Sequence, residues 1–187
     1  MAGLKRLMNK WAAPWVMLLL STWASSSAPA SGTPSEYEVK AAFLYNFAKF
    51  VTWPQDNHRD PAGDVIIGIL GRDPFGPAFD QAIAGRTIGG RGLRIERFRS
   101  PMAAKRCHIL FIGASETWSL DEIFDALSGW PILTVGDAPE FIQQGGMIRF
   151  FMMDEKVRFE INLDMAESAD LRISSKLLRV AKVQGED

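Results

Sequence analysis

The chain has 187 residues and a formal net charge of −1, with 21 Lys and Arg residues against 22 Asp and Glu residues. A balance this even gives no reason to expect nucleic acid as a partner, since nucleic-acid-binding domains are usually basic. Cys107 is the only cysteine, so the fold cannot depend on an intramolecular disulfide. The apolar residues that follow Cys107 favour a buried thiol over one that cross-links two chains.

The N-terminal segment has the order of a secretory signal peptide. Three basic residues precede an apolar run at residues 11–24, and small residues then lead to Ala30. The apolar run is shorter than the roughly 20 residues that cross a bilayer, so an uncleaved membrane anchor is the weaker alternative. We predict that residues 1–30 are a signal peptide and that residues 31–187 form a single exported domain.

The first predicted helix begins with a capping box, in which Ser35 and Glu38 bond to each other's backbone. The helix is predicted to run from about residue 36 to Trp53, because Pro54 then ends it. Lys40 interrupts the apolar face and must either extend to solvent or pair with a carboxylate. The rest of that face consists of Val39, Phe43, Leu44, Phe47, Ala48, Phe50 and Val51.

Apolar runs and helix signals alternate through the middle of the chain. Strands are predicted at residues 65–70, 93–98, 108–112 and 131–135. Asp73 and Pro74 predict the start of a helix, as N-cap and first helical residue, and Gly85 ends it. A second capping box, Ser119 with Glu122, predicts another helix, and a short one is predicted at residues 139–144.

The rhythm changes near the C-terminus. Residues 147–153 and 157–163 are joined only by three polar residues, which predicts an antiparallel hairpin. A final helix is predicted at residues 174–183. The four residues 150–153 are apolar on both strand faces, so they lie either within the sheet or against another subunit. We therefore predict an α/β fold: a mixed, mostly parallel sheet of about six strands, helices on both faces, and a C-terminal antiparallel hairpin.

No motif predicts a cofactor, a metal ion or catalysis. Residues 69–76 form a strand, turn and helix start, but the glycine spacing does not fit a dinucleotide loop and no Walker lysine follows. His58 and His108 are the only histidines, and the adjacent Cys107 and His108 point to opposite faces of a strand. Asp73, Ser115 and Asp137 follow strands and could converge, although capping and turn chemistry explain them equally well.

Two surfaces are candidates for binding another protein. Basic residues crowd into positions 86–106, as a solvated face or as a surface for an acidic partner or lipid headgroups. Tyr45 and Trp53 lie on the polar side of the first helix, as binding anchors or beneath a second layer of packing. The basic residues are Arg86, Arg91, Arg94, Arg97, Arg99, Lys105 and Arg106. The predicted partner-binding residues are Tyr45, Asn46, Lys49, Trp53, Arg91, Arg94, Arg97 and Arg99.

The segment from Val39 to Pro54, VKAAFLYNFAKFVTWP, resembles the opening signature of the YfiR-type family of periplasmic proteins. Further blocks follow in the order of that family over nearly the whole of the predicted mature chain. These blocks are residues 69–76, 107–112, 133–137, 145–148, 157–163 and 173–178.

The resemblance implies a periplasmic repressor that binds the periplasmic sensing domain of an inner-membrane diguanylate cyclase and keeps cyclic-di-GMP synthesis low. It also implies that an outer-membrane lipoprotein can sequester the repressor, which links envelope stress to biofilm regulation, and that the repressor can form a homodimer. Family members can use a disulfide through the cysteine that matches Cys107. This chain has no second cysteine, so redox control of folding is not expected here.

Two hypotheses from other classes remain open at this stage. A periplasmic solute-binding sensor would hold an amino acid or similar small molecule beside residues 71–75 and 136–137. A hydrolase would need Asp73, Ser115 or Asp137 to have a base within reach. Neither hypothesis is supported by a motif, and we expect a protein that binds and does not catalyse.

Overall fold

The computed structural model describes residues 34–54, 63–114, 116 and 119–183. All of them belong to the second of the two units into which the chain divides, residues 33–187. Within these residues, eight strands form one sheet in the order β10-β8-β7-β6-β5-β2-β4-β3. The six longer strands are β2 (Val65–Leu70), β4 (Arg91–Phe98), β5 (Ile109–Ile112), β6 (Leu133–Gly136), β7 (Ile148–Met153) and β8 (Lys156–Ile161).

The pairing of these strands confirms the predicted mixed, mostly parallel sheet. Strands β4, β2, β5, β6 and β7 pair in parallel, whereas β7 and β8 pair antiparallel. Each edge carries a strand of two residues: β3 (Thr87–Ile88) is antiparallel to β4, and β10 (Lys182–Val183) is parallel to β8. Two residues give too little periodicity for either edge strand to be visible in the sequence.

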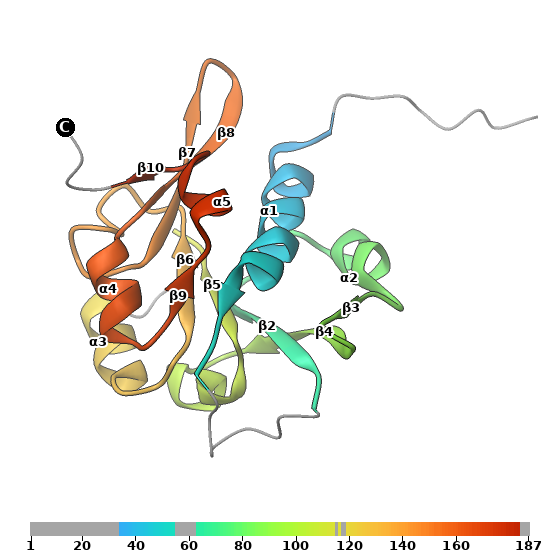
Figure 1. The fold of residues 1–187 in the computed structure, drawn as a ribbon, viewed down its shortest axis with the longest axis horizontal. Coiled ribbons are helices and arrows are strands. Elements are labelled where there is room, and N and C mark those ends of the chain that lie inside the picture. The colour runs from blue at the N-terminus through green and yellow to red at the C-terminus, as the bar shows by residue number, and fades with distance from the viewer. Residues whose placement is uncertain (1–33, 55–62, 115, 117–118, 184–187) are drawn as a thin grey trace, which may run out of the picture. The chain divides into compact units, whose positions relative to one another are not determined.

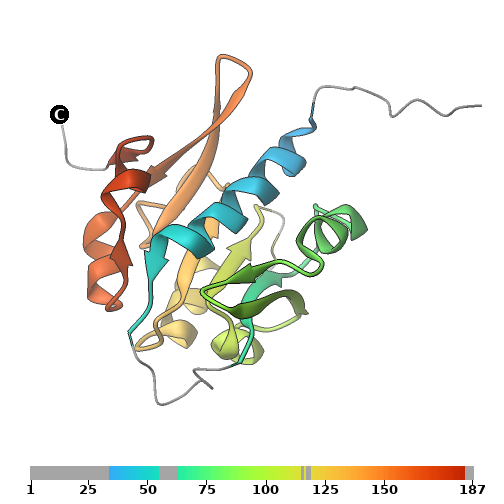
Figure 2. The ribbon, with the colours of Figure 1, turned by 45° about the vertical axis from the view of Figure 1, so that its right-hand side comes forward.

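Side chains of the central strands alternate between two apolar cores. On β2, Val65, Ile67 and Ile69 enter the first core, while Ile66 and Leu70 enter the second. The first core lies under helices α1 (Glu36–Phe50), α2 (Pro77–Ile83) and α5 (Ser175–Leu178). The second lies under the 3₁₀ helix η1 (Pro101–Arg106) and helix α3 (Leu120–Leu127). Helices therefore cover both faces, as predicted, and Figures 1 and 2 show α1 lying along the first face.

The start of α1 agrees with the prediction and its end does not. Ser35 Oγ accepts a bond from the Glu38 N–H, and Glu38 accepts one from the Ser35 N–H at 2.6 Å. The helix was predicted to reach Trp53 but ends at Phe50, where β1 (Val51–Thr52) pairs antiparallel with β9 (Arg172–Ile173). Branched Val and Thr side chains favour extended backbone, and the partner strand supplies the bonds that another helical turn would have made.

Two predicted helices between the strands are also corrected. Asp73 is not an N-cap: α2 begins at Pro77 after Gly76, and the Asp73 carboxylate instead accepts bonds from the N–H groups of Phe75 and Gly76. An Asx turn therefore precedes the helix, since short Asp side chains bond readily to backbone two residues ahead. The predicted helix at residues 139–144 is wrong, because these residues form successive turns.

The C-terminal hairpin forms as predicted but does not end the fold. Pairing runs from Ile148 opposite Ile161 to Met153 opposite Lys156. Helix α4 (Leu163–Ser168), β9, α5 and β10 follow it. The predicted helix at residues 174–183 is thus mostly wrong, because only four of its residues are helical and the chain then joins the sheet edge as β10.

The apolar segment at the end of β7 is divided between core and solvent. Phe150 is buried in the first core, whereas Met152 and Met153 are each 50% exposed. Both ribbon views show the β7–β8 hairpin extending beyond the neighbouring elements, which explains why its tip is uncovered (Figures 1 and 2). Cys107 is fully buried in the second core, which confirms the predicted burial of the thiol.

Candidate functional site

The carboxyl edge of the sheet carries a buried ion-pair cluster centred on Asp137. This residue follows β6, and its Oδ2 lies 2.7 Å from Lys40 Nζ, which α1 brings to the edge. Lys40 Nζ is also 2.7 Å from Glu36 Oε1. Asp137 accepts further bonds from the Ala114 N–H at 2.9 Å and the Tyr37 hydroxyl at 3.3 Å. Lys40 is 3% exposed, so the structure selects the second of its two predicted solutions, a carboxylate partner.

Charge in this cluster is stabilised by the ion pairs. Burial on its own would lower the pKa of Lys40, but hydrogen bonds to Asp137 and Glu36 outweigh burial and raise it. Burial raises the pKa of Tyr37, and the nearby charge of Asp137 adds to that effect. Lys40 therefore stays charged and Tyr37 stays protonated at neutral pH, so both can keep donating to Asp137.

The second acidic residue at this edge, Asp73, is held by other groups. Its Oδ1 accepts the two N–H bonds of the turn before α2, and its Oδ2 lies 2.8 Å from Arg97 Nε. Ser115 and His58 lie outside the described residues. The two carboxylates that the hydrolase and solute-binding hypotheses require thus already accept bonds from groups of the chain itself. Within the described ranges, no group of three or more His, Cys, Asp and Glu side chains could hold a metal ion.

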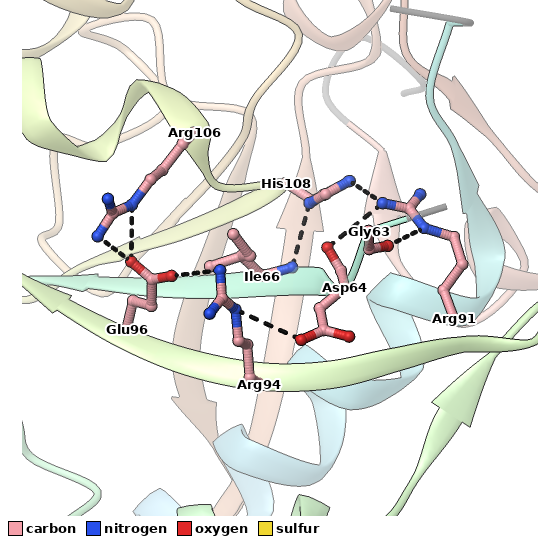
Figure 3. Close-up of polar contacts among 8 residues, drawn as sticks. All are labelled: Gly63, Asp64, Ile66, Arg91, Arg94, Glu96, Arg106 and His108. Carbon is pink, nitrogen blue, oxygen red and sulfur yellow. Dashed lines mark hydrogen bonds and ion pairs between the residues drawn. The ribbon is translucent and has the colours of Figure 1, made fainter. Parts of the chain in front are cut away.

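Much of the predicted basic surface is an internal network of ion pairs and hydrogen bonds (Figure 3). Glu96 on β4 lies between two arginines, 2.9 Å from Arg94 and 2.7 Å from Arg106. Arg91 donates to the backbone oxygens of Gly63, at 2.6 Å, and Asp64, at 3.3 Å. These side chains connect the start of β2 to β4 and η1, so much of their charge and hydrogen-bonding capacity is already used within the molecule.

Arg97 is neutralised in the same way, by two carboxylates. It donates to both oxygens of Asp80, at 3.0 and 2.5 Å, in addition to Asp73. Hydrogen bonds from Arg97 hold the pKa of Asp80 below its ordinary value of 3.8. Arg99 differs, because it is exposed and forms no ion pair with any described residue. Of the predicted contact arginines, Arg99 therefore presents its full charge to a partner, whereas Arg94 and Arg97 are already paired with carboxylates.

Two cations gather on the ring of Tyr45, which is half-buried on α1. Lys49 Nζ is 5.2 Å from the centroid of this ring, and the guanidinium of Arg86 is 4.9 Å from it. Both cations are exposed, and among the described residues neither has a carboxylate partner. Asn46 lies beside Tyr45 and is half-buried. The structure thus joins the two predicted surfaces at one place, through Arg86.

An apolar groove of about 420 Å³ begins at this cluster and runs between α1 and α2. The two helices lie side by side in both ribbon views (Figures 1 and 2). Sequence reasoning missed this groove, because its alanines look like ordinary helix formers. Its lining residues are Ser35, Tyr37, Glu38, Ala41, Ala42, Tyr45, Pro74, Phe75, Ala78, Phe79, Ala82, Ile83 and Arg86.

Trp53 lies at the opposite, amino edge of the sheet. Its indole Nε1 donates to the backbone oxygen of His108 at 3.1 Å, and its ring meets the His108 ring edge-on at 5.6 Å. His108 is buried, and its Nδ1 accepts the Ile66 N–H at 3.1 Å. Arg91 Nη2 lies 3.0 Å from His108 Nε2 (Figure 3). Trp53 and Arg91 therefore both contact His108, which lies 55 positions from Trp53 and 17 from Arg91 in the chain.

The model of the YfiR/HmsC-like family matches residues 37–182, which include every described strand except the end of β10. The chain belongs to the YfiR/HmsC-like family. The match begins in α1 and includes Lys40 and Asp137 of the ion-pair cluster and all the groove residues from Tyr37 onward.

A solved structure shares the fold of this YfiR/HmsC-like chain. It is described as a conserved domain protein from Vibrio cholerae O1 biovar El Tor strain N16961, with a TM-score of 0.55 and 12% sequence identity. The match covers 80% of this chain and 60% of that one, so the chain spans three fifths of the length of its neighbour. Within the described residues, no helix is both long and apolar enough to cross a bilayer.

Proposed function

We propose that this protein is a periplasmic repressor that binds the periplasmic domain of an inner-membrane diguanylate cyclase and thereby lowers cyclic-di-GMP. The observation that carries the proposal is the family match over residues 37–182. Repression needs no chemistry of its own. A protein that binds one arrangement of the partner's sensor domain more tightly than the other shifts the partner toward that arrangement by the difference in affinity.

The arrangement of charged groups supports a protein-binding role over a solute-binding one. The solute hypothesis places a small molecule at residues 71–75 and 136–137, where the ammonium group of Lys40 already lies on Asp137. A ligand amine would have to displace a buried lysine, whose own charge would then lose its most buried carboxylate partner. The exposed cation of Lys49 and the half-buried ring of Tyr45, in contrast, are available on the surface of α1, and the exposed Arg86 lies beside them.

Among the eight proposed contact residues, Tyr45 and Lys49 are the strongest candidates. Lys49 is exposed without an ion pair among the described residues, and aromatic side chains are favoured as binding anchors. Asn46 and Arg99 are secondary candidates. Arg94 and Arg97 are weaker ones, because carboxylates of the same chain neutralise them, and Trp53 and Arg91 are engaged around His108. An outer-membrane lipoprotein and a second copy of this chain are further proposed partners.

Deletion of the gene in its host, with measurement of intracellular cyclic-di-GMP, tests the repressor role. The concentration of cyclic-di-GMP should rise after deletion. Expression of the full chain in trans should return it to the level of the undeleted host. A version starting at Ser31 behind a new Met should fail to restore it, because the export signal proposed for residues 1–30 would be absent. An unchanged or lowered concentration after deletion would contradict repression.

A further inference from the structure

We propose that the groove between α1 and α2 receives an apolar side chain of the cyclase's periplasmic domain, with a neighbouring carboxylate of that domain bound between Arg86 and Lys49. This inference rests on the proposed repressor function and adds the docking site and the chemistry of the partner segment. The surface is called the α1–α2 groove below and has the lining given above.

The shape of the groove favours a side chain carried by a protein over a free small molecule. Ala42, Ala78 and Ala82 line it and are themselves exposed, so it is a trough on the surface and not an enclosed cavity. Small-molecule sites usually bury most of the ligand surface. A trough covers only one side of its occupant, and the backbone of a partner protein would cover the other.

The floor of the groove is apolar and closely packed. Phe75 and Phe79 are buried there with ring centroids 5.1 Å apart, and Phe75 packs against Tyr37 at 5.4 Å and Phe111 at 4.8 Å. Tyr37 is in turn held by Asp137, in the ion-pair cluster that ties α1 to the sheet. A closely packed floor suits a buried anchor, because side chains already held by their neighbours cost little binding energy to order.

Charge sets the direction of the occupant. Along α1 the groove passes from Ser35 and Glu38 at one end to Tyr45 at the other, where Arg86 and Lys49 flank the ring. These two cations have no carboxylate partner among the described residues, unlike Arg94, Arg97 and Arg106. A partner carboxylate beside the apolar anchor would form ion pairs with both cations. In the reverse orientation this carboxylate would lie near Glu38 and be repelled.

Photo-crosslinking in the host tests where the partner docks. A flexible diazirine side chain is placed at Ala42 or Ala78 in the groove, or at Ala103, an exposed control on η1 beside the second core. We expect Ala42 and Ala78, and not Ala103, to crosslink to the periplasmic part of a membrane protein with a cyclase domain. The crosslinked peptide should contain an apolar residue next to Asp or Glu.

Two substitution pairs then test the groove and its cations, with affinity measured against the periplasmic domain so identified. Ala82→Trp should fill the trough and weaken binding about tenfold or more, while Ala103→Trp leaves it unchanged. Arg86→Glu should weaken binding more than Arg158→Glu on β8, which reverses an exposed arginine outside the proposed contact residues that also lacks an ion pair with any described residue. Near-native thermal unfolding of each variant shows that the effect is on binding.

The outcomes separate this inference from the repressor function. Crosslinks to the cyclase from Ala103 alone would refute the α1–α2 groove as the docking site while leaving the proposed repressor function intact. Crosslinks between two copies of this chain from Ala42 or Ala78 would make the groove a self-interface and overturn the docking site. If deletion leaves cyclic-di-GMP unchanged and no position crosslinks to a cyclase, both proposals fail.

Discussion

Lys40 Nζ and Asp137 Oδ2 are 2.7 Å apart at the carboxyl edge of the sheet, and they join residues that are separated by 97 positions in the chain. The lysine comes from the first helix and the aspartate from the turn after β6. Lys40 lies on the same buried face of α1 as Leu44 and Phe47, so the ion pair and the apolar packing hold the helix against the sheet together. One wall of the α1–α2 groove therefore depends on a buried ion pair as well as on apolar packing.

Replacing one member of this pair should destabilise the protein strongly. Lys40→Met leaves the Asp137 carboxylate mostly buried without its cation, and we expect a loss of about 3 kcal/mol in the free energy of unfolding. Urea unfolding measures it. The double variant with Asp137→Asn should lose less than the two single variants together, since neither charge is then stranded. Lys49→Met, on the exposed side of α1, is the matched control, and a Lys40→Met variant as stable as it would refute the prediction.

The bond between Arg97 and Asp80 should appear in the pH dependence of stability. Arg97 holds the pKa of Asp80 below 3.8, so the folded state favours the carboxylate, and this stabilisation is present at neutral pH. Asp80→Asn should therefore lower stability at pH 7 by about 0.5 kcal/mol, a small amount because both side chains are partly exposed. The difference from the unmodified protein should vanish as the pH falls below 3.8. A deficit of the same size at pH 7 and in acid would contradict the prediction.

Trp53 should contribute to stability more than to partner binding. Trp53→Phe keeps an aromatic ring against His108 but removes the indole N–H that donates to the His108 backbone oxygen. We expect a loss of about 1 kcal/mol in unfolding free energy, with the affinity for the partner changed less than twofold. Thermal unfolding and binding of the same variant measure the two effects. A large loss of affinity with unchanged stability would restore Trp53 as a binding anchor.

The hairpin turn between β7 and β8 should accept a stabilising replacement. Asp154 and Glu155 have φ of 49° and 58°, the left-handed conformation at both central positions of a two-residue turn. Asn-Gly is the preferred pair for this turn. Asp154→Asn with Glu155→Gly should raise stability by up to about 1 kcal/mol, and an increase in Tm measures it. Asp154→Val, with a branched side chain at positive φ, should lower the Tm, and the opposite order of the two variants would contradict the turn type.

Prediction from the sequence succeeded where the deciding interaction is local. Both capping boxes, Ser35 with Glu38 and Ser119 with Glu122, lie within four residues, and both are present. The run at residues 65–70 is of the kind seen in strands buried on both faces, because such continuity leaves no polar face, and it forms the fully buried β2. The hairpin followed from the shortness of its connection.

Prediction failed where a distant partner decides the conformation. Val51 and Thr52 continue the helical pattern of α1, but β9 pairs with them from more than 100 positions away. Val180 looks like part of a final helix, yet the chain turns there to reach β8, and Val180 is 66% exposed. Local preference is weak beside the backbone bonds that tertiary pairing supplies.

The sequence by itself determined where the longer strands lie along the chain, the two capped helices, the buried thiol and the resemblance to the family, because each depends on near neighbours or on recurring blocks. Only the tertiary structure decided how charge is distributed over the surface. Arg86 and Arg94 belong to the same basic segment, and nothing in the sequence distinguishes their roles. Only the fold brings a carboxylate to Arg94 and the ring of Tyr45 to Arg86. Which cations a partner can use is set by distances between segments far apart in the chain, and no local pattern records these distances.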